Sequence, residues 1–462
     1  MKKLQVQHRA LAKLLPVKLP DPGQAVRAFD YLLTAEVPEG LLVYQSALCA
    51  LVLLEAEEKE LLQCTVFPEE PSESLRWLAE QRFLVPAGHD DRAFCRDVRA
   101  AARLVRRLAD EDGCEGFTIL TTTACNARCF YCFEKGCAAV TMTEETAAAA
   151  AEYILAEGNQ KQVRLCWFGG EPTVNTRAID QLTEALTAAG RPYTSSMISN
   201  GYLLDEKLVE KAAGQWKLKR VQITLDGTEK IYNERKAYVG VSGSAFQKVM
   251  QNIALLLNAG IAVQVRLNVD TENVDDLSLL SDQLKERFGG RKNFSAYAVA
   301  LFDQEDLPSS YDERLRASQR INRRLRELQF ESAAPLEHFP VIFNCMADSG
   351  SGPVIMPDGG LRSCEHISAS KDWGNVFQPV KRPEAEKDYW KELYPEQPEC
   401  KGCLAFPSCV RLKHCEPRPA ICTEAMREEA CRKLTDGLLN TWKRIKDYRE
   451  GRQAEENPPQ SC

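Results

Sequence analysis

The stretch Cys125-Asn-Ala-Arg-Cys129-Phe-Tyr-Cys132 places three thiols on one short segment. It follows the apolar residues Phe117–Leu120, which predict a buried strand. Three thiolates on one loop can ligate three irons of a cubane 4Fe–4S cluster. The fourth iron would keep an open coordination position, and open positions support chemistry. The alternative is a zinc knuckle or a chance group of buried thiols, but zinc sites usually have a second Cys-x2-Cys pair or histidines close by.

Around this segment, apolar strands alternate with amphipathic helices. The predicted strands are Phe117–Leu120, Val163–Phe168, Ser195–Ile198, Val221–Thr224, Ala262–Leu267 and Phe294–Val299. The predicted helices between them are Thr143–Ala156, Thr176–Ala189, Asp205–Ala213, Ala245–Ala259 and Val274–Arg287. This alternation predicts an α/β fold of parallel strands with right-handed crossovers, as an open sheet or a barrel. In such folds, functional side chains collect at the carboxyl ends of the strands.

Three further motifs stand at predicted strand ends. Gly169-Gly170-Glu171-Pro172 ends the second strand, Ser199-Asn200-Gly201 follows the third, and Thr224-Leu225-Asp226-Gly227 ends the fourth. Each alone is a common turn. Together with the cysteine triplet, and with Tyr131 before its last cysteine, they resemble the radical S-adenosylmethionine (SAM) enzymes. The resemblance implies a partial (β/α)6 barrel.

This resemblance implies roles for individual residues. Cys125, Cys129 and Cys132 would be catalytic, as ligands of a 4Fe–4S cluster that, with bound SAM, generates a 5′-deoxyadenosyl radical. Gly170 and Glu171 would receive the SAM ammonium group. The expected SAM-binding residues are Tyr131, Gly169, Gly170, Glu171, Pro172, Ser199, Asn200, Thr224, Arg235, Lys236 and Arg266. Ser199 and Thr224 would contact the ribose or the carboxylate, and the choice of carboxylate partner among the three basic residues stays open.

A second group of cysteines lies near the carboxyl terminus. The spacing is Cys345-x13-Gly359-x4-Cys364 and then Cys400-x2-Cys403-x5-Cys409-x5-Cys415, followed by Cys422 and Cys431. It resembles the SPASM extension, which carries auxiliary 4Fe–4S clusters, although the family commonly leaves three residues before the position of Cys415. A zinc ribbon is the alternative, because Cys-x2-Cys pairs suit zinc equally well.

The SPASM resemblance implies a division of these thiols between one or two auxiliary clusters. Cys345, Cys364 and Cys415 would serve the first. The ligands of the second would be Cys400, Cys403 and Cys409, with either Cys422 or Cys431. If one of the last two is structural, the first cluster would keep an open iron. Glu365, next to Cys364, is a candidate base.

The residues before the barrel predict a small recognition module. Gly40–Tyr44 is extended, Glu55–Gln63 and Glu73–Gln81 are helical, and the strand Arg82–Val85 leads into a turn. Helices followed by a strand and turn predict a winged-helix-like module. Resemblance to peptide-modifying radical enzymes implies that it binds a leader peptide as an added strand. A purely stabilising cap is the alternative.

The composition excludes several classes of protein. The 462 residues carry a net charge of −7, which disfavours a nucleic-acid partner. The longest apolar run, Ala47–Leu54, is shorter than a membrane span of about 20 residues. Lys13 and Pro16 interrupt any secretory core, so we expect a soluble, cytoplasmic protein without a membrane partner. The 18 cysteines and only five histidines indicate thiolate chemistry, with iron–sulfur or zinc.

These observations predict five segments: a winged-helix-like module (1–112), a barrel (113–305), a helical linker (306–340), a SPASM domain (341–440) and a helix end with a disordered tail (441–462). The predicted function is a radical SAM peptide maturase that forms a cysteine thioether, with a flavodoxin or ferredoxin as reductant. One alternative is an enzyme that resembles anaerobic sulfatase maturases and forms formylglycine. The other is a non-catalytic, zinc-bearing scaffold that binds peptides.

Overall fold

The computed structural model describes the chain except residues 110–112, 303–308, 331–333, 344, 351, 367–369, 416–418, 420 and 450–462. The tail predicted to be disordered therefore lies outside the described residues from residue 450 onward. Before it, residues 441–449 continue the long helix α13 (Glu424–Arg449), so the boundary predicted at residue 440 falls inside a helix.

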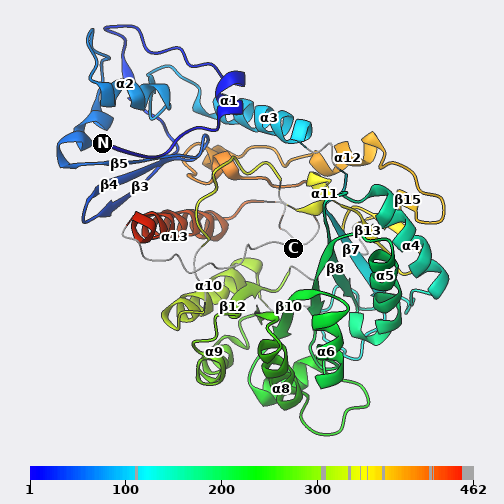
Figure 1. Ribbon diagram of the computed structural model, residues 1–462. Coiled ribbons are helices and arrows are strands. Elements are labelled where there is room, and N and C mark those ends of the chain that lie inside the picture. Colours follow the sequence, from blue (N-terminus) through cyan, green and yellow to red (C-terminus); the bar gives the residue numbers. More distant parts are fainter. Residues whose placement is uncertain are drawn as a thin grey trace.

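Six parallel strands in sequential order form the centre of the molecule (Figure 1). They are β7 (Gly116–Thr122), β8 (Val163–Gly169), β9 (Tyr193–Ser199), β10 (Leu218–Leu225), β11 (Ala262–Val269) and β12 (Phe294–Ala300). The helices that cover them are α4 (Glu144–Glu157), α5 (Thr176–Ala188), α6 (Glu206–Gly214), α7 (Glu229–Lys236), α8 (Ala245–Asn258), α9 (Val274–Phe288) and α10 (Tyr311–Glu327). The predicted strands and helices are confirmed, and the fold is an α/β partial barrel.

Alternation along the strands separates the core from the barrel interior. In β11, Val263, Val265 and Leu267 are buried in the apolar core that the strands share with the helices, whereas Gln264 and Arg266 are only half-buried. Because successive side chains of a strand point to opposite faces, the polar set faces the interior of the barrel. Arg266 is therefore placed on the face where a site can form.

The cysteine-rich region continues the barrel sheet. Its strand β13 (Val354–Ile355) pairs in parallel with β7, and β14 (Gly360–Arg362) and β15 (Gly374–Asn375) follow in antiparallel order. Cys364 comes two residues after β14. The remaining elements of this region are α11 (Met346–Ser349), α12 (Glu384–Lys391), the 3-10 helices η3 (Pro398–Cys400) and η4 (Phe406–Ser408), and α13.

The amino-terminal module is richer in strands than predicted. Its sheet has the order β1 (Lys2–Gln5), β5 (Ala50–Leu54), β4 (Gly40–Gln45), β3 (Leu32–Val37), and all its pairs are antiparallel. A second, two-stranded sheet pairs β2 (Val26–Ala28) with β6 (Leu84–Pro86). The helices are α1 (Arg9–Leu14), α2 (Glu73–Glu80), α3 (Asp91–Ala109) and the 3-10 helix η1 (Ala56–Gln63), where an ordinary helix was expected.

The module shares its cores with the carboxyl-terminal region. One face of its sheet packs on α2, and the other packs on Leu438 and Trp442 of α13 (Figure 1). A third core joins Tyr31 and Val98 of the module to Phe406 of η4, with Cys400 and Cys403 packed against it. The amino-terminal residues therefore form part of the surroundings of two candidate cluster ligands.

Within the described part of the chain, no helix has the length and apolar character needed to cross a membrane.

Candidate active site

The loop with Cys125, Cys129 and Cys132 leaves the carboxyl end of β7 and is fixed by backbone hydrogen bonds. The N–H of Glu171 donates to the carbonyl of Ala124 at 3.0 Å, and the N–H of Arg128 donates to the carbonyl of Lys236 at 2.8 Å. Burial raises the pKa of the Cys125 thiol to about 12 and that of Cys132 to about 11, and each interacts electrostatically with Cys129. The three thiols therefore face one another, and a bound metal would favour their thiolate forms.

Two glycines let the end of β8 touch this loop. Gly169 has a φ of +122°, and a Cβ on it would lie 2.1 Å from the carbonyl oxygen of Thr122. A Cβ on Gly170 would lie 2.5 Å from the carbonyl oxygens of both Thr123 and Ala124. Only glycine permits this approach of two backbone segments.

We expect Gly170→Ala to displace the cysteine loop and to lower the iron bound there. The added methyl must push backbone atoms aside, which costs about 1–3 kcal/mol of folding free energy. Iron per chain after anaerobic reconstitution and the thermal midpoint both measure this. Gly214→Ala is the matched control, because a Cβ there meets nothing within 4 Å. An iron content equal to that of the control would contradict the expectation.

Glu171 joins the ends of β8 and β9. Its carboxylate is fully buried and accepts hydrogen bonds from the N–H and hydroxyl of Thr173, the hydroxyl of Ser199 at 2.9 Å and the N–H of Asn200 at 2.8 Å. Burial raises the pKa of Glu171, and these donors oppose the rise. Glu171 thus positions Ser199 and Asn200, a role that the sequence did not predict. Its contact with the SAM ammonium group stays a prediction.

Two other predicted residues line the same strand ends. The Asn200 side chain donates to Oδ1 of Asn126 at 2.7 Å, within the cysteine loop, and its Nδ2 lies 3.9 Å from Sγ of Cys125. Pro172 begins the 3-10 helix η2 (Pro172–Asn175), and its carbonyl accepts from the buried hydroxyl of Thr121. Asn200 therefore contacts the cysteine loop, and Pro172 ties η2 to the end of β7.

A buried polar network occupies the ends of β10 and β11. Tyr131 donates its hydroxyl proton to Oδ2 of Asp226 at 2.5 Å, and Nζ of Lys236 donates to the Tyr131 oxygen and to the Thr224 hydroxyl, each at 2.8 Å. Lys236 also lies 3.2 Å from Asp226, and Asn268 donates to Asp226 at 3.0 Å. Burial alone would lower the pKa of Lys236, but the Asp226 carboxylate raises it well above its usual value. Asp226 and Asn268 were missed, although Asp226 stands within a quoted motif.

The three candidate cations differ in the donors that remain available. The ammonium of Lys236 has three N–H groups and three oxygen neighbours. Arg235 pairs with Asp270 and lies over the Phe130 ring at 4.8 Å, while Arg266 lies over Phe302 at 5.7 Å. In each arginine, Nε is buried without a hydrogen-bond partner among the described residues. The arginines therefore retain donors for an anion.

The carboxyl-terminal thiols form two groups. In the first thiol group, Cys364 interacts electrostatically with Cys345 and Cys415. In the second thiol group, the neighbours of Cys403 are Cys409, Cys422 and Cys431, and Cys409 also faces Cys400. A cavity of about 410 Å³ is lined by Cys400, Cys403, Cys409 and Cys422. No three described Cys, His, Asp or Glu side chains stand close enough to hold a single metal ion.

The segment after Cys364 reaches the barrel. Glu365 is a charged neighbour of both Cys345 and Cys364. The ring of His366 stacks on Phe133, which follows Cys132, at 4.2 Å, and its centroid lies 5.6 Å from that of Phe302. The first thiol group is thus next to the cysteine loop of the barrel. No pattern in the sequence pointed to His366.

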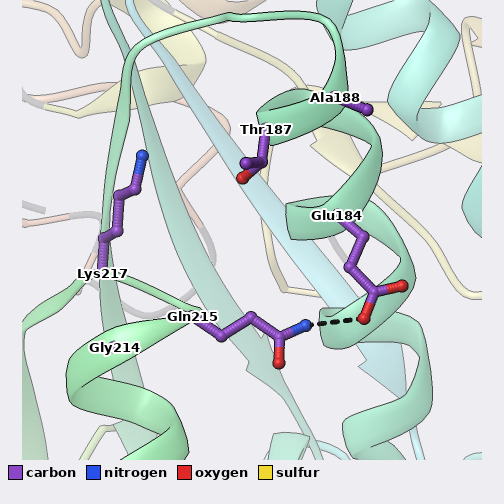
Figure 2. A pocket seen from close by; sticks show the side chains of 6 residues that line it. All are labelled: Glu184, Thr187, Ala188, Gly214, Gln215 and Lys217. Atoms are coloured by element: carbon purple, nitrogen blue, oxygen red, sulfur yellow. Dashed lines mark hydrogen bonds between the residues drawn. The ribbon is translucent and has the colours of Figure 1, made fainter.

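A second pocket lies away from these residues. It is lined by Glu184, Thr187 and Ala188 of α5 and by Gly214, Gln215 and Lys217 before β10 (Figure 2). Gln215 donates to Glu184 at 3.0 Å, and Lys217 lies over the Tyr193 ring at 4.2 Å. This is the amino end of the strands, opposite the motifs, and no predicted site residue lines it.

Comparisons with known proteins agree with this arrangement. Residues 119–283 match the profile of the Radical SAM superfamily, and no curated protein matches the chain. Solved anSMEcpe with bound AdoMet has 15% identity and a TM-score of 0.53, over 73% of this chain and all of that chain. Its complex with AdoMet and the Cp18Cys peptide has 16% identity and a TM-score of 0.52, over the same shares of the two chains. Streptococcus suis SuiB bound to precursor peptide SuiA has 13% identity and a TM-score of 0.50, over 83% of this chain and 94% of that chain.

Residues 119–283, which make up most of the barrel, are therefore a radical SAM domain, and the chain is an enzyme that contains this domain. At these identities, the solved structures show the shared fold alone. The superfamily implies a 4Fe–4S cluster and SAM. A non-catalytic scaffold, one of the predicted alternatives, does not agree with this domain.

Proposed function

We propose that the chain is a peptide maturase that uses SAM to oxidise a ribosomally made peptide, forming a bond between a cysteine sulfur and a carbon. The observation that supports this most directly is the position of the first thiol group, next to the cysteine loop of the barrel. A substrate held between them could reach both. The structures of SuiB and anSMEcpe with peptides support a peptide substrate.

The residues fit the proposed cofactors. Three thiols converge at the mouth of the barrel, and four more surround a cavity large enough for a group of several atoms. Cys125, Cys129 and Cys132 would hold the first 4Fe–4S cluster, and the two other thiol groups would hold the auxiliary clusters. When bound, the first cluster and SAM supply the radical that removes a hydrogen atom from substrate.

The chain's own residues would then orient SAM. Gly170 and Glu171 would receive its ammonium group, and Ser199 and Thr224 stand at the neighbouring strand ends. Arg235 and Arg266 are better placed than Lys236 to pair with the carboxylate, because they retain unpaired N–H donors. Thioether formation removes a hydrogen atom from carbon, a proton from the thiol and one further electron, which the auxiliary clusters would accept.

Metal analysis tests the cofactor assignment. We expect about 12 irons with equal sulfide per chain after anaerobic reconstitution, which corresponds to three four-iron clusters. A content of about eight irons per chain would mean that one auxiliary cluster is absent. Zinc with little sulfide would contradict the proposal.

Mass spectrometry of the peptide product distinguishes the proposal from its rival. A thioether keeps the cysteine sulfur, loses two hydrogen atoms and no longer reacts with iodoacetamide. Formylglycine made from cysteine loses the sulfur and reacts with hydrazides. An aldehyde product would favour the maturase that resembles sulfatase maturases.

We further propose that the amino-terminal module binds the leader of this peptide as a strand added to β3. In the described residues, β3 is an end strand of its sheet and pairs with β4 alone. Because successive N–H groups of a strand point to opposite edges, either Thr34 or Ala35 presents its N–H outward.

Proline at each of these two positions tests the added strand. Proline at the position whose N–H faces β4 removes a hydrogen bond within the sheet, so that variant should be less stable. Proline at the position whose N–H faces outward should keep the stability of the parent and bind a labelled precursor peptide at least about tenfold more weakly. Alanine at Thr34 and glycine at Ala35 are the controls. Unchanged peptide affinity in both proline variants would favour a stabilising cap.

A further inference from the structure

The cavity beside the second thiol group has a wall made by the amino-terminal module. Three arginines of α3 line it, and two others come from the cysteine-rich region. The five are Arg96, Arg99, Arg103, Arg411 and Arg427. Two glutamates, Glu396 and Glu399, also line it. Thiols and guanidinium groups from distant parts of the chain thus face one space.

The three arginines of α3 differ in how their charge is compensated. Arg96 donates to both oxygens of Glu396, at 3.0 and 3.1 Å. Arg99 is 8% exposed and donates to the backbone carbonyl of Cys409 at 2.9 Å, with its guanidinium 4.9 Å above the Phe406 ring. In Arg103, Nε and Nη2 are buried and have no hydrogen-bond partner among the described residues, although the Asp348 carboxylate lies near enough to act on its charge. Arg99 and Arg103 therefore bring positive charge to the cavity, and Arg103 brings unused donors.

Such charge would act on an iron–sulfur cluster. A four-iron cluster held by four thiolates is an anion, and its reduction adds one more negative charge. Nearby positive charge and hydrogen bonds to sulfur stabilise the reduced form and raise the reduction potential. The effect is larger in a cavity than in water because the effective dielectric constant is lower.

We propose that Arg99 and Arg103 stabilise the reduced form of the cluster held by the second thiol group. The amino-terminal module would thereby set the reduction potential of that cluster. This inference rests on the auxiliary clusters of the proposed function. It gives the module a role in electron acceptance beside its proposed role in peptide binding.

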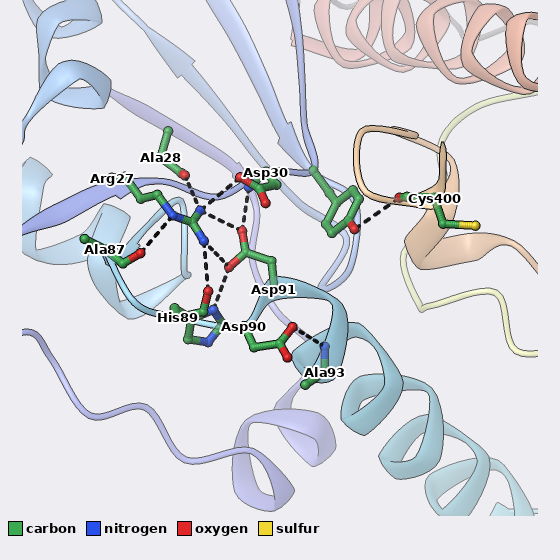
Figure 3. Close-up of polar contacts among 10 residues, drawn as sticks. Arg27, Ala28, Asp30, Ala87, His89, Asp90, Asp91, Ala93 and Cys400 are labelled. Carbon is green, nitrogen blue, oxygen red and sulfur yellow. Dashed lines mark hydrogen bonds and ion pairs between the residues drawn. The ribbon is translucent and has the colours of Figure 1, made fainter. Parts of the chain in front are cut away.

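The start of α3 is firmly tied to the rest of the module (Figure 3). The buried carboxylate of Asp91 accepts from Nη1 of Arg27 on β2 at 2.9 Å and from the N–H of Asp30 at 2.7 Å. The next residue after Asp30, Tyr31, donates its hydroxyl proton to the carbonyl of Cys400 at 3.3 Å. These contacts hold α3 beside the thiols of the second group.

The test is a redox titration followed by electron paramagnetic resonance. It uses the full chain with Cys125, Cys129 and Cys132 replaced by alanine, so that the auxiliary clusters alone give signals. At the parent's midpoint potential, we expect Arg103→Gln to lower the ratio of reduced to oxidised cluster at least tenfold, which for one electron is about 59 mV. Arg103→Lys keeps the charge and should recover part of the shift, and Arg99→Gln should act in the same direction as Arg103→Gln.

Two controls separate this effect from damage to the fold. Arg106→Gln removes a charge from an exposed position of the same helix and should leave the midpoint unchanged. Iron per chain should equal that of the parent in every arginine variant. Adding Cys403→Ala should remove the signal that shifted, which assigns it to the second thiol group.

The outcomes distinguish this inference from the proposed function. If both auxiliary signals are present and Arg103→Gln moves neither, the inference is wrong and the clusters stand. If the triple-alanine chain binds no iron, both the assignment of the auxiliary clusters and this inference are wrong. A shift of equal size in Arg106→Gln would also overturn the inference, because it would show a general charge effect.

Discussion

Replacing Cys125, Cys129 and Cys132 together with alanine is expected to reduce 5′-deoxyadenosine production below about one-thousandth of the parent rate, because the radical chemistry belongs to the cluster and its SAM. The same variant should lose about four irons per chain. The three thiols lie together at the end of β7, and the triple variant leaves none of them to hold the cluster. Chromatography of the reaction mixture and iron analysis measure the two effects.

Cys137→Ala is the matched control for this variant. Cys137 is an exposed thiol that follows the triplet in the same loop, outside the cysteine spacing. It should keep both the iron content and the rate of the parent. Production of 5′-deoxyadenosine by the triple variant would contradict the assignment of the first cluster, whatever the auxiliary thiols bind.

The barrel could be predicted because its periodicities are regular. Every predicted strand lies within an observed strand, from β7 to β12. The strand β5 could not be predicted in the same way. All five of its residues are buried, so its sequence shows no alternation and resembles any short apolar run. The sequence therefore showed the apolar run at Ala47–Leu54 but not its structure.

The strand-end motifs came together as predicted because parallel strands have their carboxyl ends at one edge. The pairing of individual side chains could not be deduced. Arg235 and Lys236 are adjacent, yet they pair with Asp270 and Asp226. Consecutive residues of a helix point about 100° apart, so neighbours in sequence face different surroundings.

The cavity beside the second thiol group shows a further limit. Spacing in the sequence groups the cysteines with one another, since thiols a few residues apart share a loop. Nothing in the spacing indicates that Arg99 and Arg103, from the amino-terminal module, line the same cavity. That contact depends on packing between Tyr31 and Phe406, whose rings stack at 5.4 Å. Such distant contacts follow from the tertiary fold alone.

Lys236→Met is expected to destabilise the chain by roughly 3–5 kcal/mol, because it leaves the Asp226 carboxylate buried without its cation. Asp226 is 0% exposed and the Lys236 side chain 3%, so water cannot replace the lost partner. Tyr131 also loses the donor that holds its oxygen beside Thr224. The change should therefore loosen the loop around Cys129 as well as lower the midpoint of unfolding by denaturant.

A second variant and a surface pair separate the buried charge from other causes. Lys236→Met combined with Asp226→Asn removes both charges and should recover part of the lost stability, because an amide costs less to bury than an unpaired carboxylate. Lys211→Met breaks the ion pair with Asp180, at 2.6 Å and 38% and 21% exposed, and should cost no more than about 1 kcal/mol. If Lys236→Met costs as little as Lys211→Met, the buried pair does not hold the ends of β10 and β11 together. If the double variant is no more stable than the single one, the loss comes from the contacts of Lys236 with Tyr131 and Thr224 rather than from its charge.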